Sequence, residues 1–326
     1  RQAVDGTSYR VRTDLGGGLR IGFVSCNGQE NGDEDREHEH RDVMWRRLLT
    51  EHLERPFALL LHGGDQLYAD EAVESHPAIS AWAKDEPARR AQEPFTPDME
   101  AALRGYFFRR YLDTLTQAAA APLYATVPSL MIWDDHDIFD GWGSHPDALQ
   151  QSPIAQGIFK VAREMFILFQ VGAVEGGLPR TCLDPSGATM TQSAHFPGFS
   201  VCLPDLRSER TPDRVMGPAG WAAFERALAD CPDGDAILLV SSVPALGPRL
   251  SLVESVLDRM PRAQKYEDDL RDQWQSRSHR AEWRRLLTLL EAKAVKGNRP
   301  LTVISGEIHL ATRAEMRLED CLLYTS

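Results

Sequence analysis

One short stretch, residues 131–144 (MIWDDHDIFDGWGS), constrains the fold of this chain more than any other. It starts as an apolar segment typical of a buried strand and then breaks into a dense polar group: Asp134, Asp135, His136, Asp137 and Asp140. Charges at the end of a buried strand need partners, and a bound cation is a common one. A lone Asp-Asp pair would be interpreted as a helix cap or a solvated loop. Four acids and a histidine beside Gly141 and Gly143 instead favour a metal site.

Three further predicted strands end in residues that can bind metals. Strand 19–25 precedes Cys26, strand 57–61 precedes Asp65 and Tyr68, and strand 301–305 precedes Glu307 and His309. In a mostly parallel sheet the carboxyl ends of the strands meet at one edge, so the four endings are expected to converge. These ligand types suit two metal ions that share a bridging carboxylate. Taken alone, Cys26 would be interpreted as a buried structural thiol, and Asp65 as a cap after a Gly-Gly turn.

The remaining chain alternates between helices and strands. Apolar spacing and Pro in the first turn predict helices over 43–53, 97–115, 153–169, 218–229 and 278–295. Strands are predicted over 195–203 and 236–241, and residues 71–96 are interpreted as an insertion with short helices. We interpret residues 1–18 as an arm that could be the tail of a preceding domain, and residues 19–326 as one domain. The chain begins with Arg1 rather than Met and stops abruptly, so our interpretation allows for residues missing from either end.

Composition excludes several classes of protein. The net charge of −12 argues against a nucleic-acid backbone as the main partner, but not against a phosphorylated substrate at a metal. The five cysteines are few and widely spaced, so a reducing, cytoplasmic compartment is expected rather than a disulfide framework. No apolar run is long enough to span a membrane and no signal peptide is visible, although one could have been lost from the N-terminus. The oligomeric state is not indicated.

Five motifs together resemble the PhoD-like (alkaline phosphatase D) branch of the calcineurin-like metallophosphoesterases. They are FVSCNG at 23–28, GGDQLYAD at 63–70, WDDHDIFDGW at 133–142, DLRSER at 205–210 and SGEIHLA at 305–311. The resemblance implies that residues 19–326 are a metallophosphatase domain, an α/β/β/α sandwich with a metal site at the C-terminal ends of its strands. It further implies hydrolysis of small phosphate esters, monoesters or diesters, by a metal-activated hydroxide at a dinuclear site.

The resemblance also implies a role for each candidate ligand. Asp65 would bridge the two ions, the first of which would also bind Cys26, Tyr68 and His309. The second ion would take Glu307 and either Asp140 or Asp135. Because thiolate and phenolate are both anionic, the first ion is expected to be iron(III). The second is expected to be divalent, with Ca²⁺ favoured over Mg²⁺, Mn²⁺ and Zn²⁺.

Three residues near the predicted ligands are expected to act on the substrate. His136 is predicted to assist the departing alkoxide or to hold the phosphate. Arg207 and Arg210 would bind substrate phosphate, or else form a structural ion-pair network with Asp205.

Two departures from the family pattern leave other functions open. Glu307 stands where Asp is expected, and Asp140 where the family often has Asn. A phospholipase D-like phosphodiesterase and a catalytically silent metal-binding protein on the same fold are the alternatives.

Overall fold

Seven strands form two sheets in the computed structural model, which describes residues 18–28, 40, 42–246, 272–296 and 299–306. The first sheet holds three parallel strands in the order β1 (Ile21–Val24), β2 (Leu59–Gly63) and β3 (Ser129–Ile132). The second sheet has the order β4 (Gln192–Phe196), β5 (Phe199–Leu203), β6 (Ala236–Ser241) and β7 (Leu301–Ser305). Only the β4–β5 pair among these is antiparallel. The predicted α/β class is therefore confirmed.

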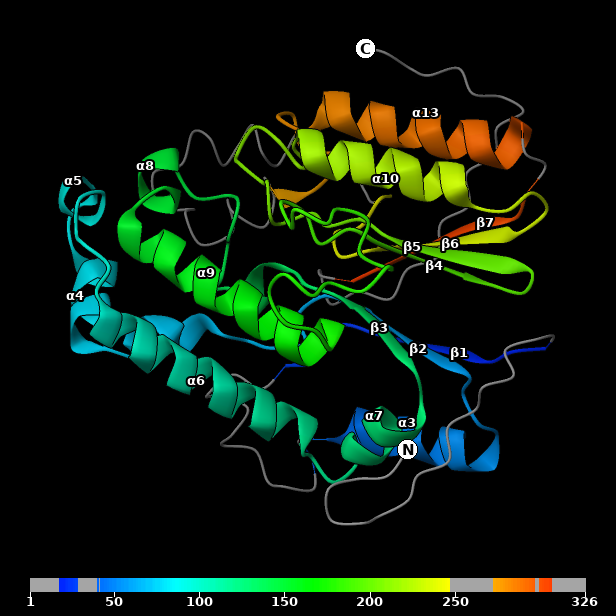
Figure 1. The fold of residues 1–326 in the computed structure, drawn as a ribbon, viewed down its shortest axis with the longest axis horizontal. Helices are drawn as coiled ribbons and strands as arrows, with labels where there is room; N and C mark the ends of the chain where they lie inside the picture. The colour runs from blue at the N-terminus through cyan, green and yellow to red at the C-terminus, as the bar shows by residue number, and fades with distance from the viewer. Residues whose placement is uncertain (1–17, 29–39, 41, 247–271, 297–298, 307–326) are drawn as a thin grey trace.

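Helices cover the outer faces of both sheets (Figure 1). α10 (Pro218–Asp230) and α13 (Arg280–Lys296) lie over the four-stranded sheet, and α3 (Val43–Glu54) and α7 (Ala121–Thr126) lie beyond the three-stranded one. The long helices α6 (Pro97–Leu115) and α9 (Pro153–Phe166) pack against each other, and α9 continues into the π-helical turn η3 (Ile167–Val171). The short helices are η1 (Asp70–Glu74), α4 (Pro77–Lys84), α5 (Pro87–Arg90), η2 (Asp135–Asp137) and α8 (Asp147–Gln150).

Three apolar clusters fill the spaces between these layers. Side chains alternate between the two faces of a strand, and β2 shows both environments. Leu61 belongs to the cluster between the sheets, together with Val240 of β6. Leu60 belongs to a second cluster, with Trp45 of α3. A third cluster joins α10 and α13 to Leu239 of β6, so the order of the layers is helix, sheet, sheet, helix.

Local sequence signals set most element boundaries. Thr96 and Ser152 cap α6 and α9 by accepting hydrogen bonds from the third residue that follows, with Pro at the first helical position, as predicted. The insertion over 71–96 contains short helices, also as predicted. The single strand predicted over 195–203 is wrong: the chain turns at Gly198, whose φ is 85°, and forms the β4–β5 hairpin.

Two findings bear on the expected environment of the protein. In the described part of the chain, Cys26, Cys182, Cys202 and Cys231 form no disulfide with one another. None of the helices that the structure describes has the length and apolar character needed to cross a membrane.

Candidate metal centre

The ends of β1 and β2 each place a predicted metal ligand in a strained backbone conformation. Cys26 follows β1 and Asp65 follows β2, and each has a φ of 53°, in the left-handed region. Within the described ranges, they are the non-glycine residues with positive φ. The left-handed conformation costs about 1–2 kcal/mol for a residue with a side chain. Residues held in this way concentrate at active sites, where the surrounding structure enforces the geometry.

Backbone hydrogen bonds hold these two residues side by side. The N–H of Cys26 donates to the carbonyl oxygen of Gly64 at 3.1 Å, and the N–H of Asn27 donates to that of Asp65 at 2.8 Å. The thiol of Cys26 lies 3.6 Å from Oδ2 of Asp65. The structure therefore brings together predicted ligands from two neighbouring strands.

The segment after β3 adds two carboxylates to this place. Ligand oxygens of Asp65, Asp134 and Asp135 lie within 4.8 Å of one another, and all three residues are buried. Gly64 permits the approach, because a Cβ at this position would lie 2.7 Å from Cβ of Asp134. We call residues 64–70 the β2 loop and residues 133–140 the β3 loop.

The electrostatics of this buried group fit a bound cation. Oδ1 of Asp65 and Oδ2 of Asp134 have no hydrogen-bond partner among the residues that the structure describes. Burial, followed by the charges of Asp134 and Asp135, raises the pKa of Asp65 well above its usual value. Burial also raises the pKa of Asp134 to about 6, although the Arg207 guanidinium opposes it. A cation would neutralise these mutually repelling carboxylates and bind their unpartnered oxygens.

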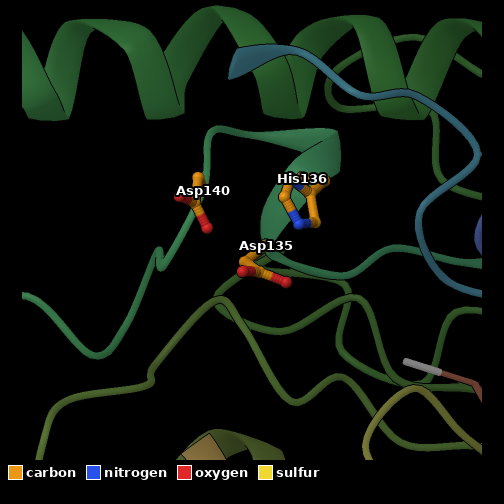
Figure 2. Close-up of side chains that lie close together, drawn as sticks. All are labelled: Asp135, His136 and Asp140. Carbon is orange, nitrogen blue, oxygen red and sulfur yellow. The ribbon is translucent and has the colours of Figure 1, made fainter. Parts of the chain in front are cut away.

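A second group of potential ligands shares Asp135 with the first. Ligand atoms of Asp135, His136 and Asp140 also lie within 4.8 Å of one another. Figure 2 shows the three side chains gathered around one space beside the short helix η2. Asp135 is buried and Asp140 is exposed, so the group extends from the interior to the surface. Asp135 is fixed in this position, because its Oδ2 accepts from the N–H of Gly141 at 2.9 Å.

His136 is oriented by two residues of the β2 loop. Its Nδ1 lies 3.0 Å from both carboxylate oxygens of Asp70, and its ring stacks on Tyr68 with the ring centroids 4.4 Å apart. Burial lowers the pKa of His136, but the hydrogen bond to Asp70 and the charges of Asp135 and Asp65 raise it to about 11. The carboxylate only accepts hydrogen bonds, so Nδ1 carries a proton.

Arg207 and Arg210 lie in a buried ion-pair network beside the candidate ligands. Arg207 is completely buried and pairs with Asp134, with Asp135 at 3.1 Å and with Asp272 at 2.6 Å. Arg210 pairs with Asp272 at 2.9 Å. The two arginines therefore take part in a buried ion-pair network, as one of the two alternatives predicted, but their shared partner is Asp272 and not the predicted Asp205.

The carboxylate of Asp205 instead accepts from Nε1 of Trp133 at 2.9 Å and from the N–H of Met190 at 2.6 Å. Asp205 therefore anchors the chain around Trp133. The ion pairs of the Arg207 guanidinium are instead with Asp134, Asp135 and Asp272. Contact of either arginine with substrate stays a prediction.

The end of β7 comes close to the end of β2. The N–H of Gly306 donates to the carbonyl oxygen of Ser241 at 3.1 Å, and a Cβ on Gly306 would collide with the carbonyl oxygen of Gly63. The predicted ligands Glu307 and His309 follow directly in the sequence, outside the described residues.

Four acidic residues near the centre were not among the predicted site residues: Asp70, Asp134, Asp137 and Asp272. Asp70 stands in the GGDQLYAD motif and Asp134 and Asp137 in the acidic stretch, so their positions carried a signal. The ion pair of Asp272 with Arg207 spans 65 residues of sequence, and no local pattern announces it.

Comparison with known proteins tests the family predicted from the motifs. A model of the PhoD-related phosphatase family matches residues 25–267. The chain belongs to this family. The uncharacterised Saccharomyces cerevisiae protein YGR266W is 23% identical over 352 residues, which cover 90% of this chain and 50% of the yeast protein. The solved structure of PhoD superposes with a TM-score of 0.56 at 14% identity, over 89% of this chain and 51% of that one. At this identity the likeness shows a shared fold, and the chain spans about half the length of both relatives.

Proposed function

We propose that this chain hydrolyses phosphate esters at a dinuclear metal centre formed by its acidic loops. The observation that carries the proposal is the buried group of Asp65, Asp134 and Asp135, with its two unpartnered carboxylate oxygens, in a PhoD-related phosphatase. The order of helix, sheet, sheet and helix supports the sandwich of the metallophosphoesterases, with the centre at the C-terminal ends of the strands.

Residues that follow β1, β2 and β3 would hold the two ions. Cys26, Asp65 and Tyr68 would bind iron(III), and Asp135 and Asp140 would bind a divalent ion, with Ca²⁺ favoured. The predicted ligands outside the described residues, Glu307 and His309, would complete the two sets. Asp65 is the predicted bridge, and Asp135 is a second candidate because it belongs to both groups. When bound, the ions would act as Lewis acids that lower the pKa of water and stabilise charge on the phosphoryl group.

His136 would act as a general acid towards the leaving group. The hydrogen bond from Nδ1 to Asp70 fixes the orientation of the ring, and the surrounding carboxylates favour its protonated form. Nε2 then carries the second proton, which it can give to the departing alkoxide oxygen. Proton transfer of this kind is typically worth about 100- to 10,000-fold in rate.

The test is hydrolysis of an aryl phosphate monoester and an aryl phosphate diester by protein purified without chelator. We expect activity that chelation abolishes and that added metal restores. His136→Ala should lower turnover about 100- to 10,000-fold while metal analysis finds both ions still bound. Metal-loaded protein without esterase activity would favour the silent metal-binding alternative. Loss of metal together with activity in His136→Ala would make His136 a ligand instead.

A further inference from the structure

Asp137 connects the two loops that form the candidate metal centre. Its side chain is completely buried. Oδ1 accepts from the N–H of Leu67 in the β2 loop at 3.1 Å, and Oδ2 accepts from the N–H of Asp134 in the β3 loop at 2.9 Å. One carboxylate therefore holds the main chain of both loops, at positions adjacent to the candidate ligands Tyr68 and Asp135.

Gln170 orients the carboxylate of Asp137 from outside the two loops. Its Nε2 donates to Oδ1 of Asp137 at 2.9 Å and to the hydroxyl oxygen of Tyr111 at 3.0 Å. Because a carboxylate only accepts hydrogen bonds, the amide must present its NH₂ group to Asp137. Gln170 lies in the π-helical turn η3. Such turns are rare in proteins overall, but those that occur are frequently found at functional sites. The loops are thereby tied to α6 and η3.

No cationic partner of Asp137 among the residues that the structure describes explains the burial of its carboxylate. None of the ion pairs found among the described residues includes Asp137, and the three groups that donate to its carboxylate, from Leu67, Asp134 and Gln170, are all N–H groups. A buried carboxylate held only by neutral donors costs folding free energy. An amide in its place could not accept from all three donors, since one side of the group would become NH₂. The carboxylate is the group that satisfies both loop amides and Gln170 together.

We propose that Asp137, oriented by Gln170, is a positioning residue that fixes the β2 loop relative to the β3 loop and so sets the spacing of the metal ligands. The inference rests on the proposed function, because the spacing matters through the ions that the loops would hold. Groups that orient metal ligands from behind typically contribute about 10- to 100-fold in metal affinity or activity.

The test compares Asp137→Asn and Gln170→Met with Tyr111→Phe in the full chain. Asp137→Asn turns one acceptor into a donor, and Gln170→Met removes the orienting amide with little change in length. Tyr111→Phe is the matched control, because it removes the other partner of Gln170 and leaves the contact with Asp137. The readouts are Mn²⁺ affinity and amide hydrogen exchange of the metal-free protein, and kcat and KM of the metal-loaded enzyme.

We expect Asp137→Asn to lower Mn²⁺ affinity and kcat by about 10- to 100-fold with little change in KM. Exchange should accelerate at the amides of Leu67 and Asp134. Gln170→Met should show the same pattern to a smaller degree, and Tyr111→Phe should stay close to wild type. If Asp137→Asn does not fold, Gln170→Met decides.

Two outcomes separate this inference from the proposed function. Variants that lose thermal stability but keep wild-type Mn²⁺ affinity and kcat would show that Asp137 is only structural, and would overturn the inference. Wild-type protein without chelator-sensitive esterase activity would overturn the proposed function. In that case Mn²⁺ affinity and amide exchange would still decide whether Asp137 positions the loops.

Discussion

The left-handed backbone of Cys26 and Asp65 indicates what each residue contributes. Glycine adopts this conformation without strain, so glycine would be the more stable choice if the backbone alone mattered. A thiol and a carboxylate stand there instead, 3.6 Å apart and held by hydrogen bonds between the two strand ends. Strained residues of this kind concentrate at functional sites, and a thiol and a carboxylate are groups that bind metal ions, which supports their proposed role as ligands.

The pKa of His136 gives the first prediction, at the same scale. Its pKa is raised to about 11 from the usual value of 6.5, so the protonated ring stabilises the metal-free protein fully below about pH 6.5. This contribution is lost as the pH rises through about 11. A hydrogen bond to a charged group contributes about 1.5–3 kcal/mol. Asp70→Asn, which keeps an acceptor but removes the charge, should therefore lower the pKa by about 1 to 2.

Measurement of this effect needs the imidazole signals of metal-free protein in an NMR titration. Wild-type His136 should stay protonated at pH 9, whereas the midpoint in Asp70→Asn should move towards neutral pH. An unchanged midpoint for His136 would show that Asp70 does not maintain its charge.

At the scale of elements, sequence patterns predicted what is local. The three strands of the first sheet and the capped starts of α6 and α9 follow from apolar runs and from Thr-Pro and Ser-Pro pairs. The β4–β5 hairpin was missed because Gly198 was interpreted as part of a continuous strand. Its positive φ requires a turn there, and the preceding Pro197 supports one.

The partners inside the site depend on which loops the fold brings together. Asp70 meets His136 across 66 residues of sequence, and Arg207 meets Asp134 across 73. Apolar periodicity predicts that strand ends gather at one edge, but not which carboxylate faces which imidazole or guanidinium. The sequence therefore indicated Cys26, Asp65 and Asp135, whereas the supporting contacts of Asp70 and Asp137 required the structure.

The close approach of β7 to β2 gives the second prediction. Gly306→Ala would place a methyl group against the backbone of Gly63, and rigid backbone cannot give way as a flexible side chain does. We expect a loss of about 1–3 kcal/mol in the free energy of unfolding and weaker metal binding. Urea denaturation and Mn²⁺ titration measure the two effects.

Gly105→Ala is the control, because that glycine lies inside α6. A Cβ at position 105 would lie 3.3 Å from Nη1 of Arg109, the end of a flexible side chain. It should stabilise the protein by up to about 1 kcal/mol, as alanine favours helix more than glycine does. Equal effects of the two substitutions would contradict a close contact at Gly306.

At the scale of the whole molecule, the acidic centre lies where both sheets end. Ser242, which follows β6, donates to Oδ1 of Asp134 at 2.9 Å, and Asp134 follows β3. Charge repulsion at this place therefore acts on the contact between the two sheets, and bound cations would relieve it. The stability of the fold and the occupancy of the centre should consequently be coupled.

This coupling gives the last prediction: the order of stability of wild type and Asp65→Asn should reverse when a metal ion is added. Because burial and neighbouring carboxylates raise the pKa of Asp65, the folded protein holds its proton more tightly than the unfolded chain does. Metal-free wild type should therefore lose stability as the pH rises above about 4, through that raised pKa. Asp65→Asn removes the charge and keeps the shape, so at pH 8 it should be the more stable protein in chelator. With Mn²⁺ at about 100 times its Kd, wild type gains about 2.7 kcal/mol and should become the more stable one.

Thermal unfolding of both proteins in chelator and in Mn²⁺ measures the reversal, with Asp113→Asn on the exposed face of α6 as the matched charge control. If Asp65→Asn is less stable than wild type in both conditions, Asp65 stabilises the fold through its hydrogen bonds. That result would contradict the expectation that its charge destabilises the metal-free protein.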